Sequence, residues 1–185
     1  MNDKVANPAP LGLMGFGMTT VLLNLSNAGL LDASSLGMIF SMGIFYGGMA
    51  QIFAGMWEMK KGNTFGATAF SSFGLFWISL VAIHVFTVLG WVGPVSAQAM
   101  AAYLFMWGLF TALMTVSTFR ASRALRVVFI TLTLLFFLLA AAEASAVSEI
   151  KTFAGYEGIF CGLSAVYLAT AEVVNETYGK TILPI

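Results

Sequence analysis

The sequence is poor in charge, cysteine and histidine. Charged residues make up 9% of the 185 residues and hydrophobic ones 59%, a balance far outside the range of soluble domains. A single cysteine, Cys161, cannot form an internal disulfide, and one cysteine with one histidine cannot supply a metal cluster. Basic and acidic residues cancel in number, which gives no reason to expect a nucleic acid or a strongly acidic partner. The serines in the apolar segments have no evident base partner, so we expect neither an enzyme nor a cofactor.

The sequence instead contains long stretches without charged residues. Residues 5–31, 33–57 and 62–119 contain no charged side chain, and the mean hydropathy is +0.92. A helix that crosses a bilayer needs about 20 mostly apolar residues. Breaks in apolarity therefore predict an all-α integral membrane protein, a bundle of six transmembrane helices forming a single membrane domain over residues 1–185. The expected helices lie near residues 8–31, 35–57, 64–91, 98–119, 123–146 and 154–177.

The distribution of basic residues predicts the orientation. Cytoplasmic loops of membrane proteins accumulate Lys and Arg. In the six-helix arrangement, Lys151 is the only basic residue on one side of the membrane, and the other basic residues fall on the opposite side. We therefore expect both termini to be cytoplasmic. The basic residues on the cytoplasmic side are Lys4, Lys60, Lys61, Arg120, Arg123, Arg126 and Lys180.

The stretch NPAPLGLMGFG, residues 7–17, is typical of a helix start. Asn7 can cap the first turn, and Pro8 suits the first helical position, where a missing N–H is no loss. Three helix N-termini would face the cytoplasm together with Arg123 and Arg126, a vestibule that favours a small anion. Ordinary capping and the orientation rule explain the same residues without an anion, so both readings stay open here.

Three bulky residues share one depth. Phe16, Phe73 and Leu132 lie nine or ten residues beyond the predicted starts of their helices, which is about 13 to 15 Å at a rise of 1.5 Å per residue. That depth is near the bilayer midplane. If these helices surround one axis, the three side chains form an apolar constriction that closes by dewetting. From the sequence alone, positions in the packed core or facing lipid explain these three residues equally well.

A few polar residues lie inside the predicted helices. Asn24 and Gln51 satisfy their own helix backbone less easily than Ser or Thr, so each is expected to form an interhelical hydrogen bond or to line a pore. His84 is the only imidazole, and a packed or interfacial place is expected for it. Glu143 fits either an interfacial position or proton exchange.

Three segments resemble the acetate uptake transporter family, which includes the bacterial succinate-acetate permeases. They are NPAPLGLMGFGMTTVLLNLSNAG, GIFYGGMAQIFAGMWEMKKGNTFGATAFSSFG and AEVVNETYGKTILPI, and the resemblance runs nearly from end to end. It implies a six-helix protomer that assembles as a homo-hexamer in the bacterial cytoplasmic (inner) membrane. It also implies one pathway per protomer for acetate and related small carboxylates.

The resemblance also assigns site residues. The family's apolar constriction maps onto Phe16 in GFG, Phe73 in SSFG and Leu132 in TLT, and the resemblance associates Leu132 and Ala165 with substrate preference. Relatives commonly carry Tyr where this chain has Phe73, so here the constriction lacks a hydroxyl. The residues expected along the pathway or in selectivity are Asn24, Gln51, Thr20, Ser72, Thr131 and Ala165.

The sequence therefore predicts transport of acetate and related small carboxylates, with succinate a candidate, by proton symport or as an anion channel. A channel for a small neutral solute such as urea or a short amide fits an uncharged bundle with an apolar constriction equally well. A scaffold or sensor without transport is disfavoured, because no soluble interaction domain is expected.

Overall fold

Within the part of the chain that the structure describes, six helices are long enough and apolar enough to cross a membrane, which confirms the predicted all-α membrane bundle. The computed structural model describes residues 5–185, and regular structure within that range is helical. Lys4, one of the basic residues behind the predicted orientation, lies outside it. The spans are α1 (Ala9–Asn27), the composite segment Ala33–Lys60, α4 (Thr64–Val88), α5 (Ala97–Thr118), α6 (Arg123–Ser145) and α7 (Ser148–Tyr178).

The second span changes its helical form along its length. It consists of the 3-10 turn η1 (Ala33–Ser35), α2 (Leu36–Met42), the π-helical segment η2 (Gly43–Ala50) and α3 (Gln51–Lys60). A Cβ on Gly47 would lie 2.9 Å from both the Thr19 side chain and the Trp77 ring. The glycine therefore lets α1 and α4 approach this span, so this small-residue contact lies within the protomer.

The observed helix starts agree only partly with those predicted from the sequence. Asn63 and Ser122 cap α4 and α6 by accepting backbone N–H groups at 3.1 Å. At the first helix, α1 begins at Ala9 and Pro8 takes the N-cap position. Asn7 lies one residue further out but still caps the first turn as expected, because its Oδ1 accepts the Ala9 N–H at 3.3 Å. The last helix begins at Ser148, six residues before the predicted start, because the polar residues after Val147 continue the helix beyond the apolar run.

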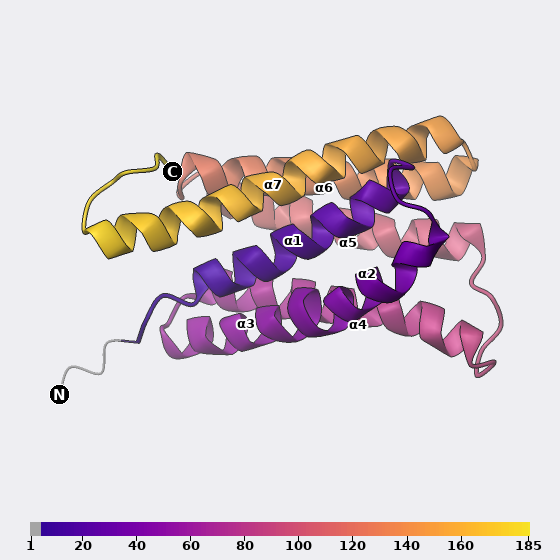
Figure 1. The fold of residues 1–185 in the computed structure, drawn as a ribbon, viewed down its shortest axis with the longest axis horizontal. Helices are drawn as coiled ribbons and strands as arrows, with labels where there is room; N and C mark the ends of the chain where they lie inside the picture. The colour runs from indigo at the N-terminus through magenta and orange to yellow at the C-terminus, as the bar shows by residue number, and fades with distance from the viewer. Residues whose placement is uncertain (1–4) are drawn as a thin grey trace.

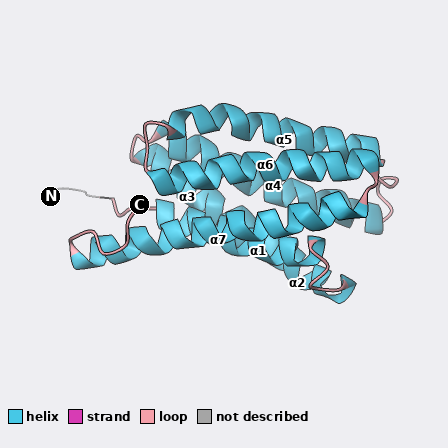
Figure 2. Ribbon diagram, turned by 90° about the horizontal axis from the view of Figure 1, so that it is seen from above, coloured by secondary structure: helices cyan, strands magenta, loops and turns pink. Residues whose placement is uncertain are grey.

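The spans lie roughly along one direction, and α1 begins at the same end of the bundle at which α7 finishes (Figure 1). Turning the molecule shows α5 and α6 as one pair and α1 and α7 as another (Figure 2). The second pair packs through reciprocal glycines, since a Cβ on Gly17 or Gly162 would lie 2.7 Å from the carbonyl oxygen of the other. Such close packing of small residues is typical of membrane helices.

Candidate functional site

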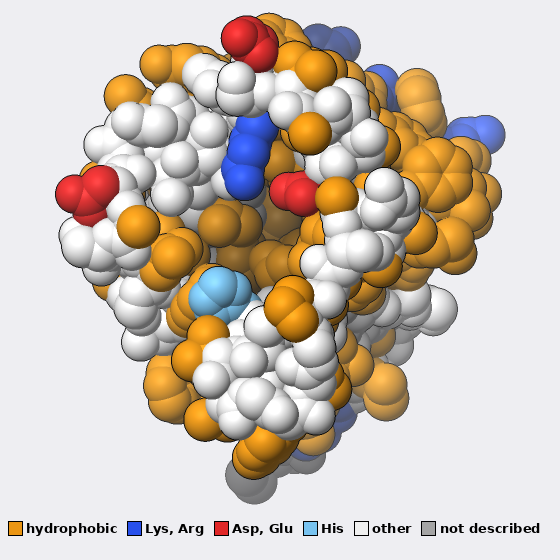
Figure 3. All heavy atoms as spheres, turned by 90° about the vertical axis from the view of Figure 1, so that its right-hand side faces the viewer, with side chains coloured by type: hydrophobic (Ala, Val, Ile, Leu, Met, Phe, Trp, Pro, Cys, Tyr) orange, Lys and Arg blue, Asp and Glu red, His pale blue; other side chains and the backbone are white. Residues whose placement is uncertain are grey.

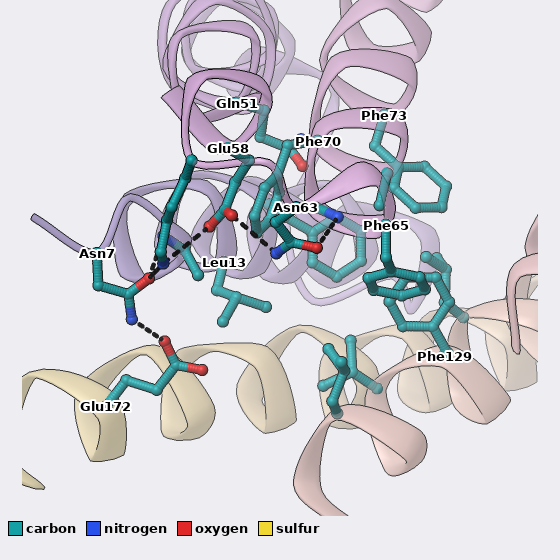
Figure 4. A pocket seen from close by; sticks show the side chains of 18 residues that line it. Asn7, Leu13, Gln51, Glu58, Asn63, Phe65, Phe70, Phe73, Phe129 and Glu172 are labelled. Atoms are coloured by element: carbon teal, nitrogen blue, oxygen red, sulfur yellow. Dashed lines mark hydrogen bonds and ion pairs between the residues drawn. The ribbon is translucent and has the colours of Figure 1, made fainter. Parts of the chain in front are cut away.

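A cavity of about 210 Å³ opens at the end of the bundle where α1 begins, and we call it the proximal cavity. Its walls are mainly apolar and come from α1, α4 and α6, with polar side chains gathered at its mouth (Figure 4). Leu13, Ala69 and Val128 are typical wall residues and are buried. The cavity is therefore an apolar chamber with a polar entrance.

Five polar residues tie four helices together at this mouth. Asn7 donates to Glu172 Oε2 at 2.8 Å and accepts from Lys61 Nζ at 3.0 Å. Lys61 Nζ also lies 3.9 Å from Glu58 Oε1, and Asn63 donates to Glu58 Oε2 at 2.7 Å. The Glu58 side chain is only 1% exposed, so the lysine and the amide compensate a buried carboxylate. Figure 4 shows this network between the α1 end and α7.

Gly66 makes room for the network. A Cβ at this position would lie 2.7 Å from Asn63 Nδ2 and 2.9 Å from Glu58 Cγ. The first turn of α4 is therefore free of a side chain where the buried carboxylate and its amide partner need the space.

The predicted constriction residues meet at the inner end of the proximal cavity. Phe16, Phe73 and Leu132 all line it and are 6%, 4% and 3% exposed. The Phe16 and Phe73 rings lie 6.1 Å apart between centroids. Four further rings surround Phe73 at centroid distances of 5.5 to 6.5 Å, those of Trp107, Phe110, Phe129 and Phe136. We call Phe16, Phe73, Leu132 and Phe136 the plug.

A second hollow of about 330 Å³, the distal cavity, lies at the other end of the bundle. Figure 3 looks onto that end and shows a hollow with an apolar floor and with basic, acidic and histidine side chains around it. His84, Glu143 and Lys151 line it, and Lys151 Nζ lies 3.9 Å from Glu143 Oε1. The His84 ring packs on Phe40 with centroids 4.7 Å apart.

Only a thin apolar layer separates the two cavities. Phe73 lines the proximal cavity and Phe76 the distal one, and three helical residues span about 4.5 Å. The Phe136 ring packs against the rings of both residues, with centroid distances of 6.5 Å to Phe73 and 5.1 Å to Phe76. Along α4, therefore, the plug is about one helical turn thick.

The two predicted polar residues behave differently from expectation. Asn24 and Gln51 both donate to their own helix, to Thr20 O at 2.9 Å and to Gly47 O at 2.6 Å, although they were expected to do so less easily than Ser or Thr. A side-chain amide reaches the carbonyl four residues back as a hydroxyl does. Gln51 nevertheless lines the proximal cavity, and its Oε1 is buried without a hydrogen-bond partner. Asn24 is buried against Gly158 of α7 and lines neither cavity.

The remaining predicted pathway residues lie outside both cavities. Thr20 and Ala165 are buried in the packed interior, and Thr131 donates back to Val127 O at 2.8 Å. Ser72 lines a separate surface hollow beside the turn between α3 and α4.

The expected basic vestibule needs correction. Asn7 lies at the proximal mouth, but Arg123 is exposed and lines neither cavity. Arg126 turns back to the end of α5, where it donates to Phe119 O at 3.1 Å and lies over the Phe119 ring. Carbonyls at a helix C-terminus attract cations, which explains this choice. Lys61 is the cation that lines the proximal cavity.

Sequence reasoning missed most of the mouth network, namely Glu58, Lys61, Asn63 and Glu172 as a connected group. The available signal was a carboxylate within EMKKGN, the charged turn between two apolar spans. Its burial depends on how α3 packs on α4, which the sequence does not display. Within the described residues there is no group of three His, Cys, Asp or Glu side chains that could hold a metal ion.

Comparisons with known proteins agree with a transport site. The model of the GPR1/FUN34/yaaH family matches residues 1–184. The succinate-acetate/proton symporter SatP of Escherichia coli K12 is 55% identical over 184 residues, covering 100% of this chain and 97% of that protein. Acetate permease A of Emericella nidulans is 34% identical over 198 residues, covering 98% of this chain and 66% of the permease. The solved structure of the bacterial acetate channel SatP superposes with a TM-score of 0.96 at 55% identity, covering 98% of this chain and 99% of that one.

Proposed function

The chain belongs to the GPR1/FUN34/yaaH family, and from this membership we propose that it carries acetate and related small carboxylates across the bacterial cytoplasmic membrane. The proposal is supported by relatives named as a succinate-acetate/proton symporter, an acetate permease and an acetate channel. Each of these names describes transport rather than catalysis.

One structural observation carries the proposal. Two cavities enter one protomer from opposite ends and come within about one helical turn of each other along α4. A solute that passes from one to the other has to cross only the plug. We assign the pathway to this line, with Phe16, Phe73 and Leu132 as its constriction.

The plug sets the physical problem of transport. A bare carboxylate loses its hydration there, which is expensive in an apolar environment. Passage therefore requires either a proton on the carboxylate or water that enters the plug transiently. Gln51 Oε1, buried and without a partner, can accept the O–H of a protonated acid just before the plug.

Ala165 contributes indirectly in this proposal. It is fully buried and belongs to the same apolar cluster as Leu132. A larger side chain would press on the cluster that forms the plug and would change the width available to the substrate. Thr20 and Asn24 are buried and support the packing of the helices around the pathway, whereas Ser72 and Thr131 lie outside both cavities.

We also propose cytoplasmic termini and a homo-hexamer. The excess of basic residues on the proximal side supports the orientation, which makes the proximal cavity the inner one. Large exposed side chains on α7, such as Phe153, Tyr156 and Phe160, offer an apolar surface to lipid or to neighbouring protomers. Native mass spectrometry in nanodiscs measures the number of subunits directly.

Flux of labelled acetate into proteoliposomes under imposed pH and voltage gradients tests the function. We expect acetate uptake that unlabelled small carboxylates compete away. Inward current carried by acetate without proton movement would eliminate obligatory symport. Competition by urea but not by unlabelled acetate would replace the proposal with a neutral-solute channel, and absence of any flux from assembled protein would refute transport.

A further inference from the structure

Three arginines surround the turn between α5 and α6, and the proposed pathway uses none of them. Arg120 lies in the turn, Arg123 begins α6 and Arg126 follows three residues later. All three lie outside the two cavities. The excess of basic residues on this side of the membrane explains their presence. It does not explain why they gather at a single turn.

The turn carries positive charge that no carboxylate offsets. Neither of the two ion pairs formed by the described residues involves an arginine. A helix N-terminus carries a partial positive charge and usually favours acidic residues in its first turn. The first turn of α6 has no acidic residue and contains Arg123 instead. A negatively charged group from outside the chain would relieve this repulsion.

Arg126 is held in place and leaves the other two arginines facing outward. Its Nη2 donates to Phe119 O at 3.1 Å, and its guanidinium carbon lies 4.9 Å from the centre of the Phe119 ring. Arg120 and Arg123 are exposed. Among the described residues, Arg126 is the only arginine whose side chain donates a hydrogen bond. The other two guanidinium groups are therefore available to a ligand.

Each exposed arginine continues an exposed apolar stripe. Residues three or four apart lie on the same face of a helix. Arg120 follows the stripe on α5 by four residues, and Arg123 precedes the stripe on α6 by four residues. The stripes consist of Leu109, Leu113 and Val116 on α5 and of Val127, Ile130 and Leu134 on α6. Each stripe rises about 10 Å from its first to its last residue, and one leaflet of hydrocarbon is about 15 Å thick.

The position of the helix pair gives these stripes access to the bilayer. Of the six spans, α5 is the least buried. It lies at the edge of the bundle beside α6 (Figure 2). The surface around the turn therefore combines positive charge at the end of the bundle with apolar side chains below it.

We propose that the α5–α6 turn binds an anionic phospholipid, with Arg120 and Arg123 on the phosphate and the two stripes along the acyl chains. Guanidinium groups donate paired hydrogen bonds to phosphate oxygens. Basic residues at the cytoplasmic ends of membrane helices are known to bind such head groups. A free anion would contact the arginines alone, whereas a lipid contacts both the arginines and the stripes. The inference goes beyond the proposed transport, because lipid binding is measured without flux.

The number of charges sets the size of the effect. One arginine near the membrane surface strengthens the binding of an anionic lipid by about fivefold. Replacing both exposed arginines by glutamine should therefore weaken this binding by about 25-fold. A zwitterionic lipid with the same acyl chains lacks the net charge, so its binding should change little. Added salt should weaken the binding of the anionic lipid more than that of the zwitterionic one.

Native mass spectrometry of the delipidated protein tests the site. The protein is titrated with phosphatidylglycerol or with phosphatidylcholine of the same acyl chains, and bound lipids are counted. We expect wild-type protein to prefer phosphatidylglycerol and the double variant Arg120→Gln/Arg123→Gln to lose this preference. The double variant Lys60→Gln/Lys180→Gln is the matched control, because it removes two exposed basic charges at the same end of the bundle. It should retain the wild-type affinity.

A conservative variant separates loss of the site from loss of the fold. Arg120→Lys/Arg123→Lys keeps both charges and should retain most of the affinity for phosphatidylglycerol.

Equal binding of the two lipids by wild-type protein would overturn the proposed site, as would equal losses in the glutamine variant and the lysine control. Displacement of phosphatidylglycerol by an equal concentration of inorganic phosphate would also overturn it, because the turn would then bind the ion alone. Acetate flux tests transport separately. Preferential lipid binding in protein without flux keeps the lipid site and refutes transport, whereas flux without lipid preference keeps transport and refutes the site.

Discussion

Replacing Phe73 by alanine should open the plug and raise acetate flux. The Phe73 ring separates the two cavities and is surrounded by five other aromatic rings. Its removal leaves a void for about three waters, at about 30 Å³ each. A charge-assisted hydrogen bond to one such water stabilises a passing carboxylate by about 1.5 to 3 kcal/mol. If this stabilisation applies at the top of the barrier, the flux rises by about ten- to a hundredfold.

The assay is uptake of labelled acetate into proteoliposomes, normalised to assembled protein. Leu132→Ala widens the plug from α6 and should act in the same direction. Phe105→Ala is the matched control, because this ring is 52% exposed and packs on Phe137 away from both cavities. Unchanged flux in both Phe73→Ala and Leu132→Ala, with intact assembly, would refute the assignment of the plug.

Three further substitutions test the proximal mouth, the cavity wall and the packing of α1 on α7. Asn7→Ala removes two hydrogen bonds to charged partners at the proximal mouth, so the free energy of unfolding should fall by about 1 to 2 kcal/mol in thermal unfolding. An unchanged melting curve would show that the network does not stabilise the fold. Gln51→Leu removes the unpaired acceptor before the plug, and acetate flux should fall about fivefold for a loss of about 1 kcal/mol; wild-type flux would contradict its role. Gly17→Ala places a methyl group 2.7 Å from a carbonyl oxygen of α7 and should reduce the yield of folded protein. The control Gly37→Ala has open space around it and should fold with the normal yield. Equal yields of the two variants would contradict the close packing of α1 on α7.

The features that depend on helix length and rise could be predicted from the sequence. Six spans follow from the long apolar stretches, because the bilayer requires about 20 such residues for each crossing. Phe16, Phe73 and Leu132 were placed at one depth by counting from their helix starts, and in the structure all three line one cavity. The three helices begin at the same end of the bundle, so equal counts along them lead to similar depths.

Features that depend on packing were missed. Burial of Glu58 requires a neighbouring helix with a glycine in its first turn, and only the packed structure supplies Gly66 at that place. Arg126 was expected to face a vestibule but instead bonds a carbonyl at the end of α5, a choice between two partners that a linear pattern does not decide. The π-helical form of Gly43–Ala50, a segment whose glycines lie against α1 and α4, was not predicted either.

In the proposed pathway, two cavities approach one plug from opposite sides of the membrane. Thiol accessibility measures this most directly, in a Cys161→Ala background with Ala69→Cys in the proximal cavity or Leu80→Cys in the distal one. A membrane-impermeant anionic thiol reagent should block acetate flux through Ala69→Cys only from the side of the termini and through Leu80→Cys only from the other side. Block of both variants from the same side, or modification of neither, would contradict a pathway that runs through both cavities.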